Sequence, residues 1–199
     1  MKRMITLNTK EKIIEVSILS FSQKSFEGTT LSEIAQMVGI QKPSMYNHFK
    51  SKNELYLVVA ERIMSLLVEK MMVTSNQYEA EDIHTRLYLV LKHSCDFILN
   101  KQEGILYKRI MLFPPIDLKK EVKDIVERGD QEIASIISQL YIHGMNENRF
   151  RDISERTFSS AYFCLLDGLF TESFIYDDQD FHQRFEEAWS VFWHGIKKS

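Results

Sequence analysis

Five polar side chains lie close together between residues 42 and 48, and most of them can donate hydrogen bonds: Lys42, Ser44, Tyr46, Asn47 and His48. Met45 and Phe49 are four residues apart, so in a short helix these two face the interior and the polar side chains face outward. Such a face suits the phosphates of DNA and the edges of its bases. Any one of these side chains, taken alone, is more often an ordinary surface or half-buried residue. The elements that position them therefore decide the interpretation.

The stretch from Thr30 to Lys52 has the pattern of two short helices joined by a tight turn. In the first helix the apolar residues recur with the spacing of one helical face, at Leu31, Ile34, Ala35 and Val38. Thr30 and Glu33 have the spacing of a capping box, in which each side chain accepts a hydrogen bond from the other residue's backbone N–H. Gly39 can adopt the positive φ that a sharp turn requires, and Pro43 loses no hydrogen bond in the first turn of the second helix. The sequence therefore predicts a helix-turn-helix, with a further helix starting at Lys52.

This stretch resembles the TetR family of bacterial transcriptional repressors. The residues that carry the resemblance are Thr29-Thr30, Ile34-Ala35, Val38-Gly39-Ile40, Tyr46, His48-Phe49, Lys52 and Leu55. The resemblance implies a set of phosphate contacts, from Thr30, Tyr46, His48 and Lys52. It also implies a set of base contacts, from Lys42, Pro43, Ser44 and Asn47. On this interpretation the stretch reads operator DNA.

Two residues depart from the family pattern. Gln41 stands where a capping Ser or Thr is common, so the start of the recognition helix is less well fixed. Ser25 stands where a Gly usually ends the first helix, so the chain leaves that helix through a residue less suited to a positive φ.

Composition and charge predict an all-α chain of two parts, with about nine helices. Only 7 Gly and 3 Pro interrupt the 199 residues, and no run shows the sustained alternation of a strand. The formal net charge is −3, but residues 1–52 carry eight Lys and Arg against four acids, while the remainder is acidic. A basic first part on an acidic body is expected of a DNA reader joined to another domain. The sequence predicts a DNA-binding domain at 1–52 and a helical effector-binding and dimerisation domain at 53–199.

Helical periodicity predicts further elements along the chain. A first helix is expected from residue 8 or 9 to about Ser25, and others at about 52–74, 80–100, 105–112, 117–143 and 179–196. Gly104 and Gly144 are expected to interrupt or end helices, and Asp152 with Glu155 is expected to cap the helix that follows.

The last two predicted helices are apolar on more than one face. Small residues among them, Ser159, Ser160, Ala161 and Gly168, allow another helix to approach closely. Burial in a larger core also explains this pattern. The family resemblance implies a symmetric four-helix dimer interface here, and a two-fold dimer would read two half-sites of a pseudo-palindromic operator.

The resemblance also implies a pocket within the body helices for a small, mainly apolar ligand. The candidate lining residues are His84, Tyr88, Tyr107, Phe113, Phe163 and Asp167. For each of them taken singly, ordinary core packing is the better explanation. The expectation is therefore a homodimeric repressor released by a small molecule. The alternative is a DNA-bound factor whose body contacts another protein and holds no small-molecule effector.

The sequence contains no recognisable motif for nucleotide binding, metal binding or catalysis. The sequence lacks G-x-G-x-x-G, a Walker A loop and H-E-x-x-H, and its histidines are not spaced as metal-ligand pairs on one helix, so neither a metal, a cofactor nor an enzyme activity is expected. Cys95 and Cys164 lie far apart and are expected to be reduced core thiols. No signal segment or membrane span is recognisable, so a cytoplasmic location is expected.

Overall fold

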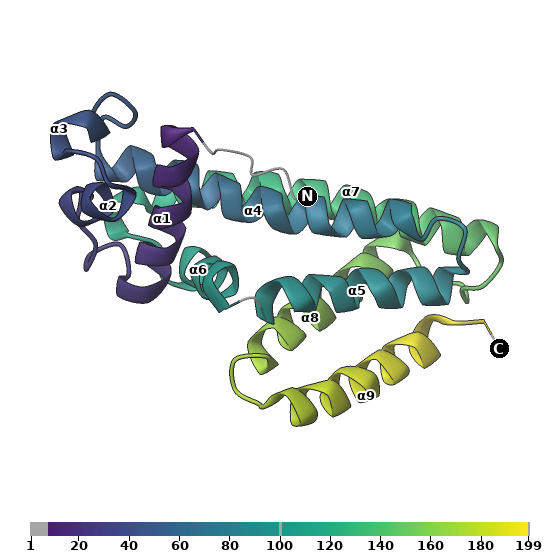
Figure 1. Cartoon of the computed structure of the whole chain (residues 1–199). Helices are drawn as coiled ribbons and strands as arrows, with labels where there is room; N and C mark the ends of the chain where they lie inside the picture. The colour runs from purple at the N-terminus through teal and green to yellow at the C-terminus, as the bar shows by residue number, and fades with distance from the viewer. Residues whose placement is uncertain (1–7, 100, 199) are drawn as a thin grey trace, which may run out of the picture. The chain divides into compact units, whose positions relative to one another are not determined.

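The computed structural model describes residues 8–99 and 101–198, and these form nine α-helices, one short 3₁₀ helix and no strand (Figure 1). The elements are α1 (Thr9–Lys24), α2 (Leu31–Val38), α3 (Lys42–Met45), α4 (Lys52–Gln77), α5 (Ile83–Leu99), α6 (Lys101–Leu112), η1 (Ile116–Leu118), α7 (Lys119–Asn146), α8 (Glu155–Glu172) and α9 (Asp178–Ile196). The predicted all-α class is confirmed. Among the described residues, no helix is both long enough and apolar enough to cross a membrane.

The chain forms two compact units. Among the described residues, unit 1 comprises 8–65 and 101–127, and unit 2 comprises 66–99 and 128–198. Helices α4 and α7 therefore contribute their first parts to unit 1 and their last parts to unit 2. The proposed functional boundary after residue 52 coincides with neither border of these units, and it remains a prediction about function.

Unit 1 holds the helix-turn-helix on a small core that includes a helix distant in sequence. Helix α1 packs against α2 and α6, and α2 packs against α3. The rings of Phe21 and Phe26 both meet Tyr56 edge-on, at centroid distances of 5.2 and 5.1 Å. Phe49 and Met45, the two residues predicted to face inward, are buried in this unit. Three short helices alone would enclose little apolar volume, so the packing of α6 on α1 enlarges the core that fixes them.

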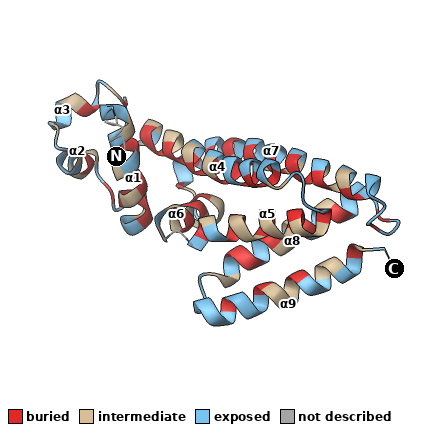
Figure 2. Ribbon diagram, turned by 45° about the vertical axis from the view of Figure 1, so that its right-hand side comes forward, coloured by how far each residue is buried: buried red, intermediate tan, exposed pale blue. Residues whose placement is uncertain are grey.

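Unit 2 is built around α5, α8 and α9. Helix α8 packs against both α5 and α9, and the buried Tyr162 hydroxyl of α8 donates to the Leu87 carbonyl of α5 at 3.1 Å. The end of the chain is tied down by two backbone bonds: Arg151 N–H donates to the Ile196 carbonyl at 2.9 Å and Lys198 N–H to the Arg149 carbonyl at 2.7 Å. Figure 2 shows exposed residues along much of α9.

Two predicted helix breaks at glycine are wrong. Gly104 lies inside α6, which begins at Lys101, and Gly144 lies inside α7, which continues to Asn146. A glycine within a helix costs only about 1 kcal/mol relative to alanine, and tertiary packing readily offsets that amount. At Gly144 the reason is visible, because a Cβ there would lie 2.2 Å from the buried ring of Phe150. The missing side chain makes room for the aromatic ring.

The predicted cap of α8 is also wrong. The N-cap is Ser154, whose hydroxyl accepts from the Thr157 N–H at 3.2 Å, and neither Asp152 nor Glu155 takes that place. Ser and Asp are comparable caps, so the sequence offered two starts and the fold selected the later one. The last helix starts close to its predicted position, with the Asp177 carboxylate accepting from the Gln179 and Asp180 N–H groups.

Candidate nucleic-acid interface

The start of α2 has the predicted capping box. The Thr30 hydroxyl accepts from the Glu33 N–H at 3.2 Å, and the Glu33 carboxylate accepts from the Thr30 N–H at 3.0 Å. The Lys24 ammonium donates to the other Glu33 oxygen at 2.9 Å. These hydrogen bonds lower the pKa of Glu33 below its ordinary value, and the bond from Lys24 has the largest effect. The exposed Thr30 hydroxyl also donates to Glu33, so it serves first to fix the helix start.

The turn after α2 depends on the conformation of one glycine. Gly39 has φ 83° and ψ 29°, and its N–H donates to the Ala35 carbonyl at 3.0 Å. The Ile40 N–H donates to the same carbonyl at 2.9 Å. A Cβ on Gly39 would meet nothing within 4 Å, so glycine is needed here for its positive φ and not for space.

The recognition helix is very short. Helix α3 spans only Lys42–Met45, with Pro43 in its first turn, and the N–H groups of His48 and Phe49 both reach the Met45 carbonyl at 2.9 Å. Gln41 is its N-cap, but its side chain makes no capping hydrogen bond, as the departure from the family pattern suggested. Burial of Met45 and Phe49 therefore contributes much to holding this helix in place.

The outward face of α3 and the turn after it has the predicted polar composition. Lys42, Pro43, Tyr46 and Asn47 are exposed, whereas Ser44 and His48 are half-buried. The described part of the chain provides no hydrogen-bond or ion-pair partner for the side chains of Lys42, Ser44, Tyr46, Asn47 and His48. A cluster of polar groups held by a capped scaffold and lacking internal partners can bond to an external one. Phosphate oxygens and base edges have the matching acceptors.

Lys52 has a role that sequence reasoning missed. Its ammonium donates to the Phe26 carbonyl at 2.8 Å and to the Thr29 carbonyl at 3.1 Å, and it lies 4.1 Å from the centre of the Phe26 ring. An ammonium has three N–H donors, so two of them are occupied inside the protein. Lys52 thus ties the start of α4 to the loop between α1 and α2. A phosphate contact through the third donor remains a prediction.

The same loop contains a strained residue. Ser25 has φ 64° and ψ 176°, a conformation that is almost confined to glycine, and its N–H donates to the Phe21 carbonyl at 3.2 Å. The conformation that glycine usually supplies in the family is therefore adopted here by serine. The ring of Tyr56 on α4 packs against Phe26 of this loop. Burial raises the pKa of Tyr56 to about 12.

The candidate effector-pocket residues are distributed over both units. Tyr107 lies buried on α6 and Phe113, which follows that helix, is 76% exposed; both belong to unit 1. In unit 2, Phe163 is half-buried and Asp167 is exposed on α8. Of the six candidates, the structure brings His84 and Tyr88 of α5 together, because the rings of both contact Trp189 of α9.

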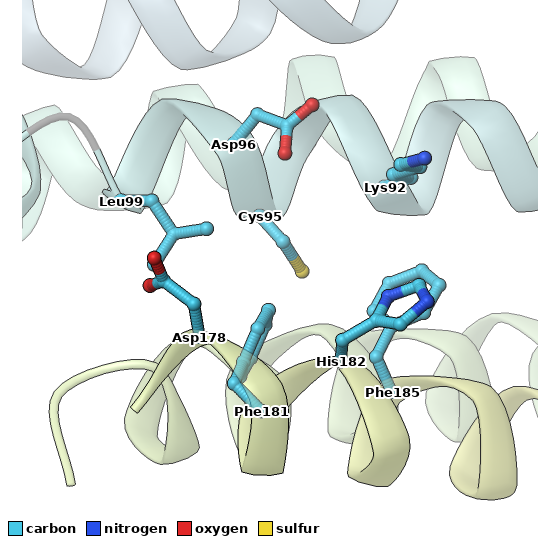
Figure 3. A pocket seen from close by; sticks show the side chains of 8 residues that line it. All are labelled: Lys92, Cys95, Asp96, Leu99, Asp178, Phe181, His182 and Phe185. Carbon is cyan, nitrogen blue, oxygen red and sulfur yellow. The ribbon is translucent and has the colours of Figure 1, made fainter. Parts of the chain in front are cut away.

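Those two residues line an open groove between α5 and α9. Its volume is about 480 Å³, and it is lined by His84, Thr85, Tyr88, Leu89, Glu186, Trp189, Ser190, Trp193 and His194. A second hollow, of about 150 Å³, lies between the same helices near the start of α9 (Figure 3). There the Cys95 sulfur points from α5 toward α9, and Lys92, Asp178 and His182 lie around it.

Cys95 is buried as expected, but Cys164 is exposed, so the prediction of a core position for Cys164 is wrong.

The comparisons agree with this geometry. Residues 13–59 match the model of the bacterial regulatory proteins of the tetR family. The chain is 28% identical over 189 residues to IcaR of Staphylococcus aureus strain Newman, an HTH-type negative transcriptional regulator of the biofilm operon icaADBC, and the match covers 92% of each chain. YerO of Bacillus subtilis, an HTH-type transcriptional regulator, is 45% identical over 62 residues, which are 31% of this chain and 22% of that protein.

Solved structures share the whole fold at low sequence identity. A TetR-family regulator from Mesorhizobium loti superimposes with a TM-score of 0.79 at 16% identity, over 96% of this chain and 97% of that one. FadR of Bacillus subtilis, solved in complex with stearoyl-CoA, gives a TM-score of 0.73 at 16% identity, over 94% of this chain and 98% of that one. The fold and site thus define a helix-turn-helix DNA-binding regulator. Residues 13–59 carry the DNA-binding segment of the tetR family of bacterial regulatory proteins, and the chain as a whole has the fold of TetR-family transcriptional regulators, a family of regulators and not of enzymes.

Proposed function

We propose that the protein is a repressor that binds a pseudo-palindromic operator as a homodimer. The observation that carries this proposal is the outward face of α3 and its following turn, where five polar side chains lack partners among the described residues. In this proposal Lys42, Pro43, Ser44 and Asn47 read bases, and a second set contacts phosphates: Thr30, Tyr46, His48 and Lys52. The name of IcaR, a negative regulator that matches nearly the whole chain, supports repression.

An apolar surface on α8 and α9 supports the homodimer. A shallow groove there is lined by Leu165, Ala188, Val191 and Phe192 and edged by the Arg184–Glu172 ion pair at 2.9 Å. Val191 is 75% exposed and shares this groove with the half-buried Leu165 and Phe192, and a contiguous apolar patch of this kind marks an interaction site where a single exposed residue would not. A Cβ added to Gly168 of α8 would meet nothing within 4 Å, so a second helix has room to approach. Pairing the same face of two copies gives the two-fold symmetry that a pseudo-palindrome requires.

We further propose that a small, mainly apolar molecule releases the operator. The FadR neighbour was solved with stearoyl-CoA, so this fold accommodates a small-molecule ligand in that protein. Binding would lower operator affinity by favouring a dimer whose two recognition helices no longer match successive major grooves. A repressor must reach DNA inside the cell, so we also propose a cytoplasmic location.

Selection of random duplex DNA by the purified protein, repeated at a low and a high salt concentration, tests the proposal. The expected product is an inverted repeat with half-sites one or more helical turns apart. Recovery of no motif, together with binding that disappears at the higher salt, would overturn it in favour of non-specific DNA contact.

Variants then test the division of roles. Lys42→Ala should relax sequence preference, whereas Tyr46→Phe should weaken binding on every sequence by a similar factor. Lys50→Ala is the matched control, because Lys50 is also exposed and close to the recognition helix but is assigned no contact. If Lys42→Ala and Tyr46→Phe lowered affinity equally on all sequences, the assignment of base and phosphate contacts would be wrong.

A further inference from the structure

The groove between α5 and α9 has aromatic walls. The ring of Tyr88 lies 5.6 Å from that of Trp189, and the ring of His84 lies 5.4 Å from Trp189 and 4.6 Å from Trp193. The two tryptophans stack at 6.2 Å. Its volume of about 480 Å³ falls within the range of small-molecule sites, roughly 300–1,000 Å³. The faces of aromatic rings carry partial negative charge and attract cations.

One carboxylate gives the groove a negative charge. The half-buried Glu186 accepts a 2.5 Å hydrogen bond from the Tyr88 hydroxyl through Oε1. Its other oxygen has no partner among the described residues, and no Lys or Arg is among the nine residues that line the groove. Burial and this hydrogen bond raise the pKa of Tyr88 to about 12, so the phenol remains a donor to the carboxylate at neutral pH. The carboxylate therefore lacks a counter-ion in the described structure.

One histidine of the groove adds an acceptor. His194 Nδ1 must donate to the Ser190 carbonyl, 2.7 Å away, which leaves the lone pair of Nε2 as an acceptor in the neutral ring. The Trp189 indole N–H donates to His84 Nε2 at 3.3 Å, so the one acceptor nitrogen of that neutral ring is already occupied within the protein. Burial lowers the pKa of His84, which keeps its imidazole neutral. The groove thus combines the second oxygen of Glu186 with an acceptor at His194 Nε2, and a ligand that fits must bring positive charge and N–H donors.

The smaller hollow between the same helices has a different character. It holds about 150 Å³, and the ammonium of Lys92 lies among its lining groups (Figure 3). Its volume is below the roughly 300–1,000 Å³ of a typical small-molecule site, and its charged lining residues are of both signs, Lys92 against Asp96 and Asp178. The larger groove is therefore the better candidate.

We propose that the α5–α9 groove binds an organic ammonium ion: a protonated amine that carries an apolar group. The ammonium would bond to the unoccupied oxygen of Glu186, and the apolar group would lie against Trp189 and Trp193. The groove residues of α9, at positions 186, 189, 190, 193 and 194, centre on the opposite side of the helix from the dimer-surface positions 184, 187, 188, 191 and 192 at 3.6 residues per turn, and the two sets meet only at their margins. The groove consequently stays open in the homodimer. This statement rests on the proposed function, because the dimer surface on α8 and α9 is part of that proposal.

The two tryptophans of the chain both line this groove, so intrinsic fluorescence reports its occupancy directly. The probe is 2-phenylethylammonium, compared with neutral 2-phenylethanol and anionic 3-phenylpropionate. We expect saturable quenching or a spectral shift with the ammonium, at an affinity about tenfold or more above that of the alcohol, and no saturation with the carboxylate. Equal binding of the ammonium and the alcohol, or no saturable change with the ammonium, would overturn the proposal.

Glu186→Gln tests the charge while retaining an acceptor for Tyr88. It should weaken ammonium binding about tenfold and leave alcohol binding unchanged. Glu187→Gln is the matched control, because Glu187 is the next residue, is exposed and lies on the other side of α9. Far-UV circular dichroism checks that both variants fold. Equal loss in the two variants, or none in Glu186→Gln, would contradict the assigned contact. These titrations contain no DNA, so a failure of the proposed operator function would leave their outcome unaffected.

Discussion

Replacement of Lys52 by methionine separates its contacts inside the protein from any contact with DNA. Methionine keeps an unbranched apolar stem but removes the ammonium that bonds to the Phe26 and Thr29 carbonyls at 2.8 and 3.1 Å. A hydrogen bond to a charged group contributes about 1.5–3 kcal/mol, and partial exposure of Lys52 reduces each to about 1 kcal/mol. The cation–π contact with Phe26 adds about 0.5 kcal/mol at such a site. The free energy of unfolding should therefore fall by about 2.5 kcal/mol.

Urea unfolding followed by far-UV circular dichroism measures this loss. Lys50→Met is the control, because Lys50 is exposed, its side chain has no partner among the described residues, and its backbone bond to Glu54 survives the substitution. The control should change the free energy of unfolding by less than about 0.5 kcal/mol. The slope of log affinity against log salt is measured on the same proteins. A phosphate contact from the third N–H of Lys52 predicts a slope about 0.9 smaller in Lys52→Met than in the wild type.

Equal stability of Lys52→Met and Lys50→Met would refute this reasoning. It would mean that water satisfies the two carbonyls of the loop as well as the ammonium does. A loss of operator affinity in Lys52→Met with an unchanged salt slope would assign the residue to positioning the helix-turn-helix, without a direct phosphate contact.

Three further predictions concern local structure. Ser25→Gly should raise the free energy of unfolding by about 1 kcal/mol in urea titrations, because glycine adopts φ 64°, ψ 176° without strain; a loss of stability would show that the serine hydroxyl contributes more than the strain costs. Gly144→Ala should lower it by about 2 kcal/mol or more, since the new Cβ would lie 2.2 Å from the Phe150 ring, and a neutral effect would mean that the ring moves freely. The hydrogen bond from Lys24, followed by those from Thr30, lowers the pKa of Glu33 in the folded protein. The ionised Glu33 therefore contributes its full stabilisation above the unfolded-state pKa of about 4.3, and this stabilisation is lost as the pH falls through the lower folded-state pKa. Glu33→Gln should abolish that part of the acid dependence of urea midpoints, and an unchanged pH profile would contradict it.

The helix-turn-helix was predictable because its determinants are local. The bonds of the capping box join residues three apart, Gly39 fixes its own turn, and Met45 and Phe49 lie on one side at helical spacing. Interactions at such short separation depend little on the rest of the fold. The positions of the outward polar residues follow from the same local geometry.

Errors arose where packing outside the helix itself, or a choice between neighbouring caps, decided a local conformation. Gly104 and Gly144 end no helix, because the packing of each unit compensates for the weak helix propensity of glycine. At Gly144 the competing group is Phe150, six residues later, whose ring occupies the space beside the glycine. The cap at Ser154 was one of several acceptable starts, and propensity alone does not choose among them.

The sequence by itself determined the helical class, the capped helix-turn-helix and the polar residues of its outward face, because these depend on contacts within one or two helical turns. Only the tertiary structure decided the partners of Lys52, which lie 26 and 23 residues earlier in the chain, and the aromatic groove, where Tyr88 meets Glu186 across 98 residues. Periodicity specifies which face of a helix is apolar, but it carries no information about which other helix covers that face. The pairing follows from the packing of all the helices together, and the groove exists only where α5 and α9 come to lie side by side.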